Sequence, residues 1–168
     1  MSDAINVRKV AIALRTFSTI EGFPVIDQAT GQECGHVNDL VYKEGRITGL
    51  LVDPKGWLTR QRFLSISDVK SFGNDAIMIT STKKLQLFER KHDYLLKHGK
   101  NRLQGMTLLS HEGEKLGLME DVYFQEEVGT IVGYEVTEGL IADLMEGRKV
   151  VKSEEPLTIA KGRAIMTE

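Results

Sequence analysis

The sequence predicts a mainly β protein made of two tandem small β-barrels joined by a partly helical linker. Three observations predict it: one pattern of glycine and apolar residues occurs twice, apolar residues alternate as they do in strands, and turn signals separate the strands. With 168 residues, of which 41% are hydrophobic and 27% charged, the chain is long enough to fold two small units. We expect the barrels at residues 16–80 and 103–168, an N-terminal extension at 1–15 and a charged linker at 81–102.

The repeat is clearest in residues 31–53 and 113–136. The flanking segments extend the match, because FPVID parallels MTLLS and DAIMI parallels RAIMT. The second copy has two extra residues near its predicted hairpin tip, and an even insertion there leaves the later side chains on their original faces. The matching pairs are Gly31/Gly113, Gly35/Gly117, Asp39/Asp121, Gly45/Gly129, Ile47/Ile131, Gly49/Gly133 and Val52/Val136.

Each copy is expected to form a long antiparallel hairpin. Apolar residues alternate over 132–136, the period of a strand with one buried face. Segments 36–43 and 120–125 are rich in Val, Leu, Tyr and Phe and predict the partner strands. The apolar spacing changes from three to two beside Asp39 and Asp121, which indicates a bulge that curls each sheet. Turn signals near residues 73–75 and 161–163 predict a second hairpin late in each copy.

Two segments have helical spacing. Before Gly147, which suits a helix end, four apolar residues predict one or two helical turns. In the linker a similar spacing predicts a helix, and a short strand around Tyr94–Leu96 is the competing interpretation. The residues that carry these patterns are Leu140, Ile141, Leu144 and Met145, and in the linker Leu85, Phe88, His92 and Leu95.

Three motifs resemble those of the PRC-barrel domain, the small β-barrel named for the photosynthetic reaction-centre H subunit and found also in the ribosome-maturation factor RimM. They are T-G-x-x-x-G-x-V-x-D-L at 30–40, G-x-I-x-G-L-L-V-D at 45–53 and F-L-S-I-S-D-V at 63–69. Both halves match, over roughly residues 16–80 and 103–167. The resemblance is specific for the fold, because the motifs consist of core and turn residues.

The resemblance implies a non-enzymatic adaptor of the bacterial cytoplasm that presents barrel loops to a protein partner. A single cysteine fits a reducing compartment, and no apolar run approaches the ~20 residues that span a bilayer. The net charge of −2 excludes a surface that is basic all over. Two alternatives stay open: an accessory role in RNA processing or ribosome maturation through the basic linker, and a small-ligand binder or enzyme of unrecognised type. A homodimer is also left open.

Four residues are candidates for partner contact: Trp57, Arg60, Arg62 and Leu51. Tryptophan beside arginines after a tight turn is typical of protein-contact sites, although a tryptophan that caps its own barrel is the competing interpretation. Leu51 faces away from its apolar neighbours in the predicted strand. It therefore needs cover from the other barrel, the linker or a partner.

We predict no catalytic, cofactor or metal site. Asp39 and Asp121 suggest a catalytic pair, but we favour carboxylates that accept backbone N–H groups at a bend, since both occupy the same position of the repeat. Cys34 and His36 share a strand face, yet a zinc site needs three or four such donors and the second copy has leucines at both positions. Cys34 has no visible base that would make it a nucleophile.

Overall fold

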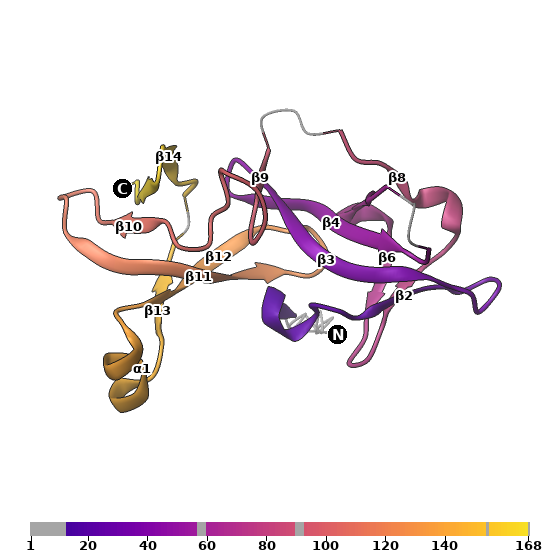
Figure 1. Ribbon diagram of the computed structural model, residues 1–168, viewed down its shortest axis with the longest axis horizontal. Coiled ribbons are helices and arrows are strands. Elements are labelled where there is room, and N and C mark those ends of the chain that lie inside the picture. The colour runs from indigo at the N-terminus through magenta and orange to yellow at the C-terminus, as the bar shows by residue number, and fades with distance from the viewer. Residues whose placement is uncertain (1–12, 57–59, 90–92, 154, 168) are drawn as a thin grey trace, which may run out of the picture.

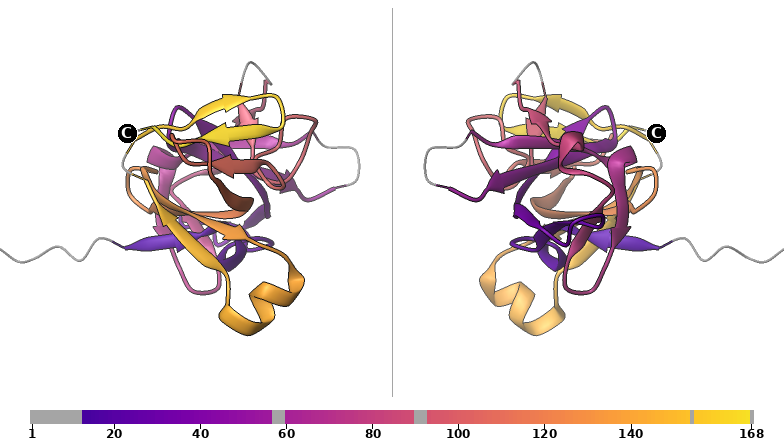
Figure 2. Two further views of the ribbon diagram at one scale, coloured as in Figure 1. Left: turned by 90° about the vertical axis from the view of Figure 1, so that its left-hand side faces the viewer. Right: turned by 90° about the vertical axis from the view of Figure 1, so that its right-hand side faces the viewer.

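The computed structural model describes residues 13–56, 60–89, 93–153 and 155–167 (Figure 1). The chain forms two curled sheets, one mostly from each half of the sequence, that lie side by side along the long axis. Figure 2 views the molecule along that axis from both ends and shows the curl of the strands. The predicted mainly β fold is confirmed.

The first sheet is built on a long hairpin of β3 (Glu33–Lys43) and β4 (Arg46–Pro54). The other elements of this half are η1 (Phe17–Thr19), β2 (Pro24–Asp27), β5 (Arg62–Ser65), η2 (Ile66–Asp68), β6 (Val69–Phe72), β7 (Ile77–Ile79), η3 (Thr82–Lys84) and β8 (Gln86–Leu87). The strand order is β6-β7-β2-β3-β4-β5-β8.

The second sheet is built on the hairpin of β11 (Lys115–Gln125) and β12 (Ile131–Thr137). The other elements of this half are β10 (Thr107–Leu109), α1 (Leu140–Glu146), β13 (Lys149–Lys152), β14 (Thr158–Ala160) and β15 (Arg163–Ile165). The strand order is β13-β12-β11-β10-β15-β14. The predicted helical turns before Gly147 are confirmed as α1.

The two sheets use the same pairings. β2 and β10 each run antiparallel to the long strand that follows, and parallel to β7 or β15. The register shifts beside Asp39 in one sheet and beside Asp121 in the other, so the predicted bulges are confirmed. The late hairpins are confirmed too, as β6–β7 and β14–β15.

The tips of the two long hairpins bond to each other. The N–H of Ile47 donates to the carbonyl of Gly129 at 2.7 Å, and the N–H of Ile131 donates to the carbonyl of Gly45 at 3.2 Å. These four residues match in the repeat, so the two bonds are reciprocal. The contact joins the sheets through backbone atoms.

Gly129→Ala should weaken this tip contact. Gly129 has φ +74°, and an added Cβ would lie 2.0 Å from the carbonyl oxygen of Ile47. We expect the free energy of unfolding to fall by about 2–3 kcal/mol, from backbone strain plus displacement of the tip. Gly162→Ala is the control, because Gly162 has φ +77° and nothing within 4 Å of an added Cβ. Equal losses in urea denaturation would contradict the tip contact.

Each half also lends a strand to the other sheet. β1 (Leu14–Thr16), which precedes the first half, pairs with β11 of the second. β9 (Tyr94–Leu95), which precedes the second half, pairs with β3 of the first. One hydrophobic core runs through both halves; its members include Ile20, Leu40, Tyr42, Leu50, Ile77, Leu103, Met119, Phe124, Tyr134 and Ala164.

The predicted linker helix is wrong for the described part of residues 81–102, where η3, β8 and β9 stand instead. The strand proposed around Tyr94–Leu96 is confirmed as β9. The apolar residues do not share one face: Leu85 packs on the main core, whereas Phe88 and Leu95 pack in a smaller cluster. An extended chain that pairs with β5 and β3 satisfies its backbone groups there. His92 lies outside the described residues.

Asp27 fastens η3 to the end of β2. Its buried carboxylate accepts N–H groups of Thr82 at 3.0 Å, Ala29 at 2.8 Å and Thr30 at 3.3 Å. The Thr82 hydrogen bond is the main cause that lowers the pKa of Asp27 below its ordinary value.

A carboxyl whose pKa is lower in the folded chain stabilises the fold above its unfolded pKa of about 3.9. That stability should be lost as the pH falls through the lower folded pKa. In urea denaturation at a series of pH values, Asp27→Asn should flatten the acid limb of the stability profile. An unchanged limb would show that Asp27 carries none of this dependence.

Candidate functional site

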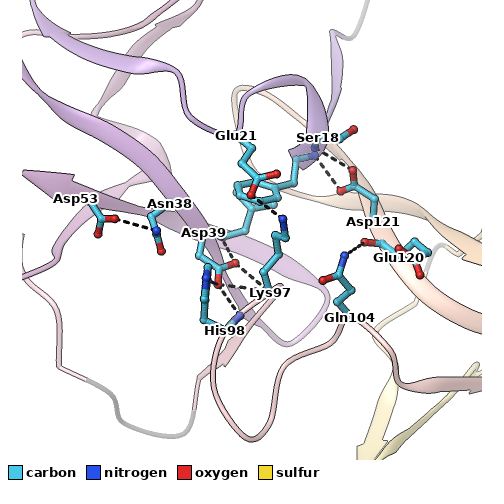
Figure 3. A network of polar contacts seen from close by, with 12 residues as sticks. Ser18, Glu21, Asn38, Asp39, Asp53, Lys97, His98, Gln104, Glu120 and Asp121 are labelled. Carbon is cyan, nitrogen blue, oxygen red and sulfur yellow. Dashed lines mark hydrogen bonds and ion pairs between the residues drawn. The ribbon is translucent and has the colours of Figure 1, made fainter.

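Asp39 lies at the first bulge and is fully buried. Its carboxylate accepts the N–H groups of Leu40 at 2.8 Å, Lys97 at 3.0 Å and His98 at 2.9 Å, and the Nδ1 of His98 lies 2.7 Å from Oδ2. Figure 3 shows this carboxylate aimed at the start of the segment that leads into the second half. Asp39 therefore holds that segment, just after β9, against the first sheet.

Asp121 does the same at the second bulge. Its carboxylate accepts the N–H groups of Phe17 and Ser18, both at 2.9 Å, and that of Val122 at 2.8 Å (Figure 3). Phe17 and Ser18 follow β1, so Asp121 holds the segment that leads into the first half. The interpretation that we favoured, carboxylates that bind backbone amides at a bend, is confirmed for both residues. Each carboxylate thus binds the backbone just after the short strand, β1 or β9, that pairs with its own sheet.

Two lysines of the linker form ion pairs within the chain. Lys97 Nζ lies 2.6 Å from a carboxylate oxygen of Glu21 and 6.0 Å from the centre of the Phe17 ring. Lys84 of the linker lies 3.3 Å from Asp68. These two lysines of the basic linker thus contribute to internal ion pairs, and binding of an anionic partner by the linker stays a prediction.

The predicted contact residues lie in different environments. Leu51 is only 1% exposed and packs with Val41 and Leu95, under Phe63 and Phe88, so the linker and β5 supply its cover. Trp57 falls outside the described residues.

The two arginines lie on the loop and strand after that gap. Arg60 is exposed, and Arg62 is half-buried in β5, opposite Val52 on one side and Leu87 on the other. Beside them, Gln61 Nε2 donates to Asp53 at 2.9 Å and so anchors the loop to the end of β4. Among the candidates that the structure describes, Arg60 is the exposed one, and its contact with a partner stays a prediction.

Among the described residues, the most exposed large apolar side chains belong to α1, which the sequence analysis predicted as a helix but did not identify as a surface. Leu144 is 80% exposed and Met145 82% exposed. In Figures 1 and 2, α1 projects away from the body at one end of the second sheet. The α1 residue Asp143 accepts a hydrogen bond from Thr137, which ties the helix to the end of β12. This tie leaves the apolar tip of α1 facing solvent.

Cys34 and the side chains that could bind a metal form no reactive site among the described residues. Burial is the main cause that raises the pKa of the half-buried Cys34 thiol, which keeps it protonated at neutral pH. Within the described ranges, no three His, Cys, Asp or Glu side chains gather as metal ligands would. No helix in that same part of the chain has the length and apolar character needed to cross a bilayer.

Comparison with known proteins agrees with this fold. A family model described as "PRC-barrel domain" matches residues 14–86, the span from β1 to β8. The chain is also 30% identical over 155 residues to "Uncharacterized protein YrrD" of Bacillus subtilis (strain 168). That alignment covers 91% of this chain and 87% of the relative. Residues 14–86 therefore form a PRC-barrel domain, and the chain belongs to one family with YrrD over most of its length.

Proposed function

We propose that the protein is a non-enzymatic adaptor that binds a protein partner through α1 and the adjoining β13. The observation that carries the proposal is the exposure of Leu144 and Met145 on a projecting helix. Two large apolar side chains in water are unfavourable until another surface covers them, and methionine is enriched where proteins bind partners. A body of two sheets with one shared core is suited to present such a helix to a partner, and exposed Arg60 supplies a further contact on the first half.

We also propose that the adaptor consists of two copies of one PRC-barrel unit, the second at residues 103–168. The shared order of strand pairings supports this arrangement. So does the matching use of Asp39 and Asp121, each of which accepts N–H groups from the other half's lead-in segment. The exchange of β1 and β9 would then keep both copies in one fixed geometry.

Affinity capture with cross-linking from native cells tests the proposal. We expect the wild type to recover one protein in stoichiometric amount, and a double variant, Leu144→Asp with Met145→Asp, to lose it. Val128→Asp is the matched control, because Val128 is 43% exposed on the β11–β12 tip, away from α1. Equal recovery by the wild type and the double variant would contradict the α1 surface. Recovery of ribosomal RNA in place of a protein would contradict the adaptor.

A further inference from the structure

The outer face of the first sheet is covered by aromatic rings of its own chain. Phe63 of β5 lies over Gly49, where an added Cβ would be 2.4 Å from the ring. Phe88 stacks on Phe63 with ring centres 6.3 Å apart and planes inclined by 25°. β8 brings Phe88 there by pairing with the outer edge of β5. The apolar face at Gly49 is thus closed by Phe63 of β5, and the strand added at the sheet edge places Phe88 against that ring.

No described residue covers the same place in the second sheet. Pairing of Leu51 with Phe63 corresponds, in register, to pairing of Glu135 with Val150. Val150 therefore occupies the position of Phe63, but it is smaller and 47% exposed. Among the described residues, β13 pairs with β12 on one side, and no counterpart of β8 pairs with β13 on its other, outer side.

A cavity of about 430 Å³ remains where the ring would lie. Gly133 forms its floor, and Leu14, Tyr123 and Val150 contribute its apolar walls. Leu14 is itself 49% exposed. Glu135, which stands where Leu51 does, is held by Arg148 at 2.7 Å and does not line the cavity. The groove is thus shaped for one aromatic or large apolar side chain.

The charges at this edge indicate what kind of strand fits. Lys149 and Lys152 are the two ends of β13, both exposed, and Lys152 also lines the cavity. Antiparallel pairing of two β13 strands centred on Val150 and Val151 would place Lys149 opposite Lys152 twice. Like charges directly opposite destabilise a pair of strands, which disfavours a second copy. Acidic side chains on an added strand would be favourable.

We propose that the outer edge of β13 and the groove beside it bind an extended segment of a partner protein, with an aromatic side chain over Gly133 and acidic residues flanking it. The segment would add as a strand at the position that β8 takes on β5. This inference rests on the proposed function and names the chemistry of the partner.

Fluorescence anisotropy with labelled synthetic peptides and the full-length protein tests the inference. The probe EELQLFEE copies residues 85–88 at its centre and adds acidic flanks. We expect saturable binding, weakened about tenfold or more in EELQLAEE, which lacks the ring, and also weakened in KKLQLFKK, whose flanks are basic. Hydrogen exchange of residues 149–152 should slow when EELQLFEE is added. Absence of binding, or equal binding by all three peptides, would overturn the inference.

Variants of the protein locate the site. Val150→Phe should fill the groove as Phe63 does and weaken EELQLFEE about tenfold or more, whereas the control Val128→Phe should leave binding unchanged. Lys149→Glu with Lys152→Glu should reverse the preference in favour of KKLQLFKK, a result that misfolding could not produce. Unchanged binding by both site variants would overturn the inference, as would a wild-type dimer that Val150→Phe abolishes. Capture of a partner through α1 would in that case still uphold the adaptor function, with α1 as its contact surface.

Discussion

Asp121→Ala is expected to lower the free energy of unfolding by about 4 kcal/mol. The carboxylate is 5% exposed and accepts N–H groups of Phe17, Ser18 and Val122. A hydrogen bond to a charged group contributes about 1.5–3 kcal/mol, and unsatisfied buried donors add a cost, although such contributions are not additive. Urea denaturation measures the loss.

Two observations separate this role from a general effect of substitution. Asp121→Asn keeps one acceptor oxygen and should cost less than the alanine variant. Hydrogen exchange at Phe17 and Ser18 should accelerate more than exchange at the centre of the first sheet. A loss below about 1 kcal/mol, with both amides still protected, would show that the Asp121 carboxylate does not hold β1 in place.

Leu51→Asp is expected to have an effect of similar size, about 4 kcal/mol. Leu51 is 1% exposed in the cluster of Val41, Leu95, Phe63 and Phe88, so a carboxylate there would lose its hydration without gaining a partner. The aspartate would either expel Phe88 and β9 from the sheet or remain buried at high cost. Thermal unfolding at neutral pH measures the change.

Glu135→Leu is the matched control, at the equivalent position of the repeat. Glu135 forms a partly exposed ion pair with Arg148, and such a pair contributes about 1 kcal/mol or less. The midpoint should therefore move much less than in Leu51→Asp. If neither variant moves it, the small cluster around Leu51 does not stabilise the packed arrangement of linker and first sheet.

The sequence predicted the parts of the fold that local pattern determines. The bulges at Asp39 and Asp121 were predictable because the apolar period changes parity there, and α1 because apolar spacing ends at a glycine. The linker helix was wrong because Leu85, Phe88 and Leu95 have helical spacing by coincidence on an extended chain. Apolar residues at helical spacing share one face only when they all lie in a single helix.

The pairing of β1 and β9 with the sheet of the other half could not be predicted from the sequence. Nothing in residues 14–16 or 94–95 shows that each strand pairs with the other half, because the apolar pattern of a strand does not identify the strand with which it pairs. The groove beside β13 was missed for a related reason. The loops before β5 and β13 differ in length, so Val150 matches Phe63 only once the strand registers are known. The need of Leu51 for cover was predicted, and the structure shows that the chain provides it.

The exchange of β1 and β9 means that neither half completes its sheet alone, so the chain should unfold as one unit. Native-state hydrogen exchange across the full chain tests this most directly, through the slowest amides of β3 and of β11. We predict that the two sets report the same free energy of opening and respond equally to added urea, and that Asp121→Ala lowers both together. Two separate opening energies, with only the second sheet weakened by that variant, would show that the halves are independent domains.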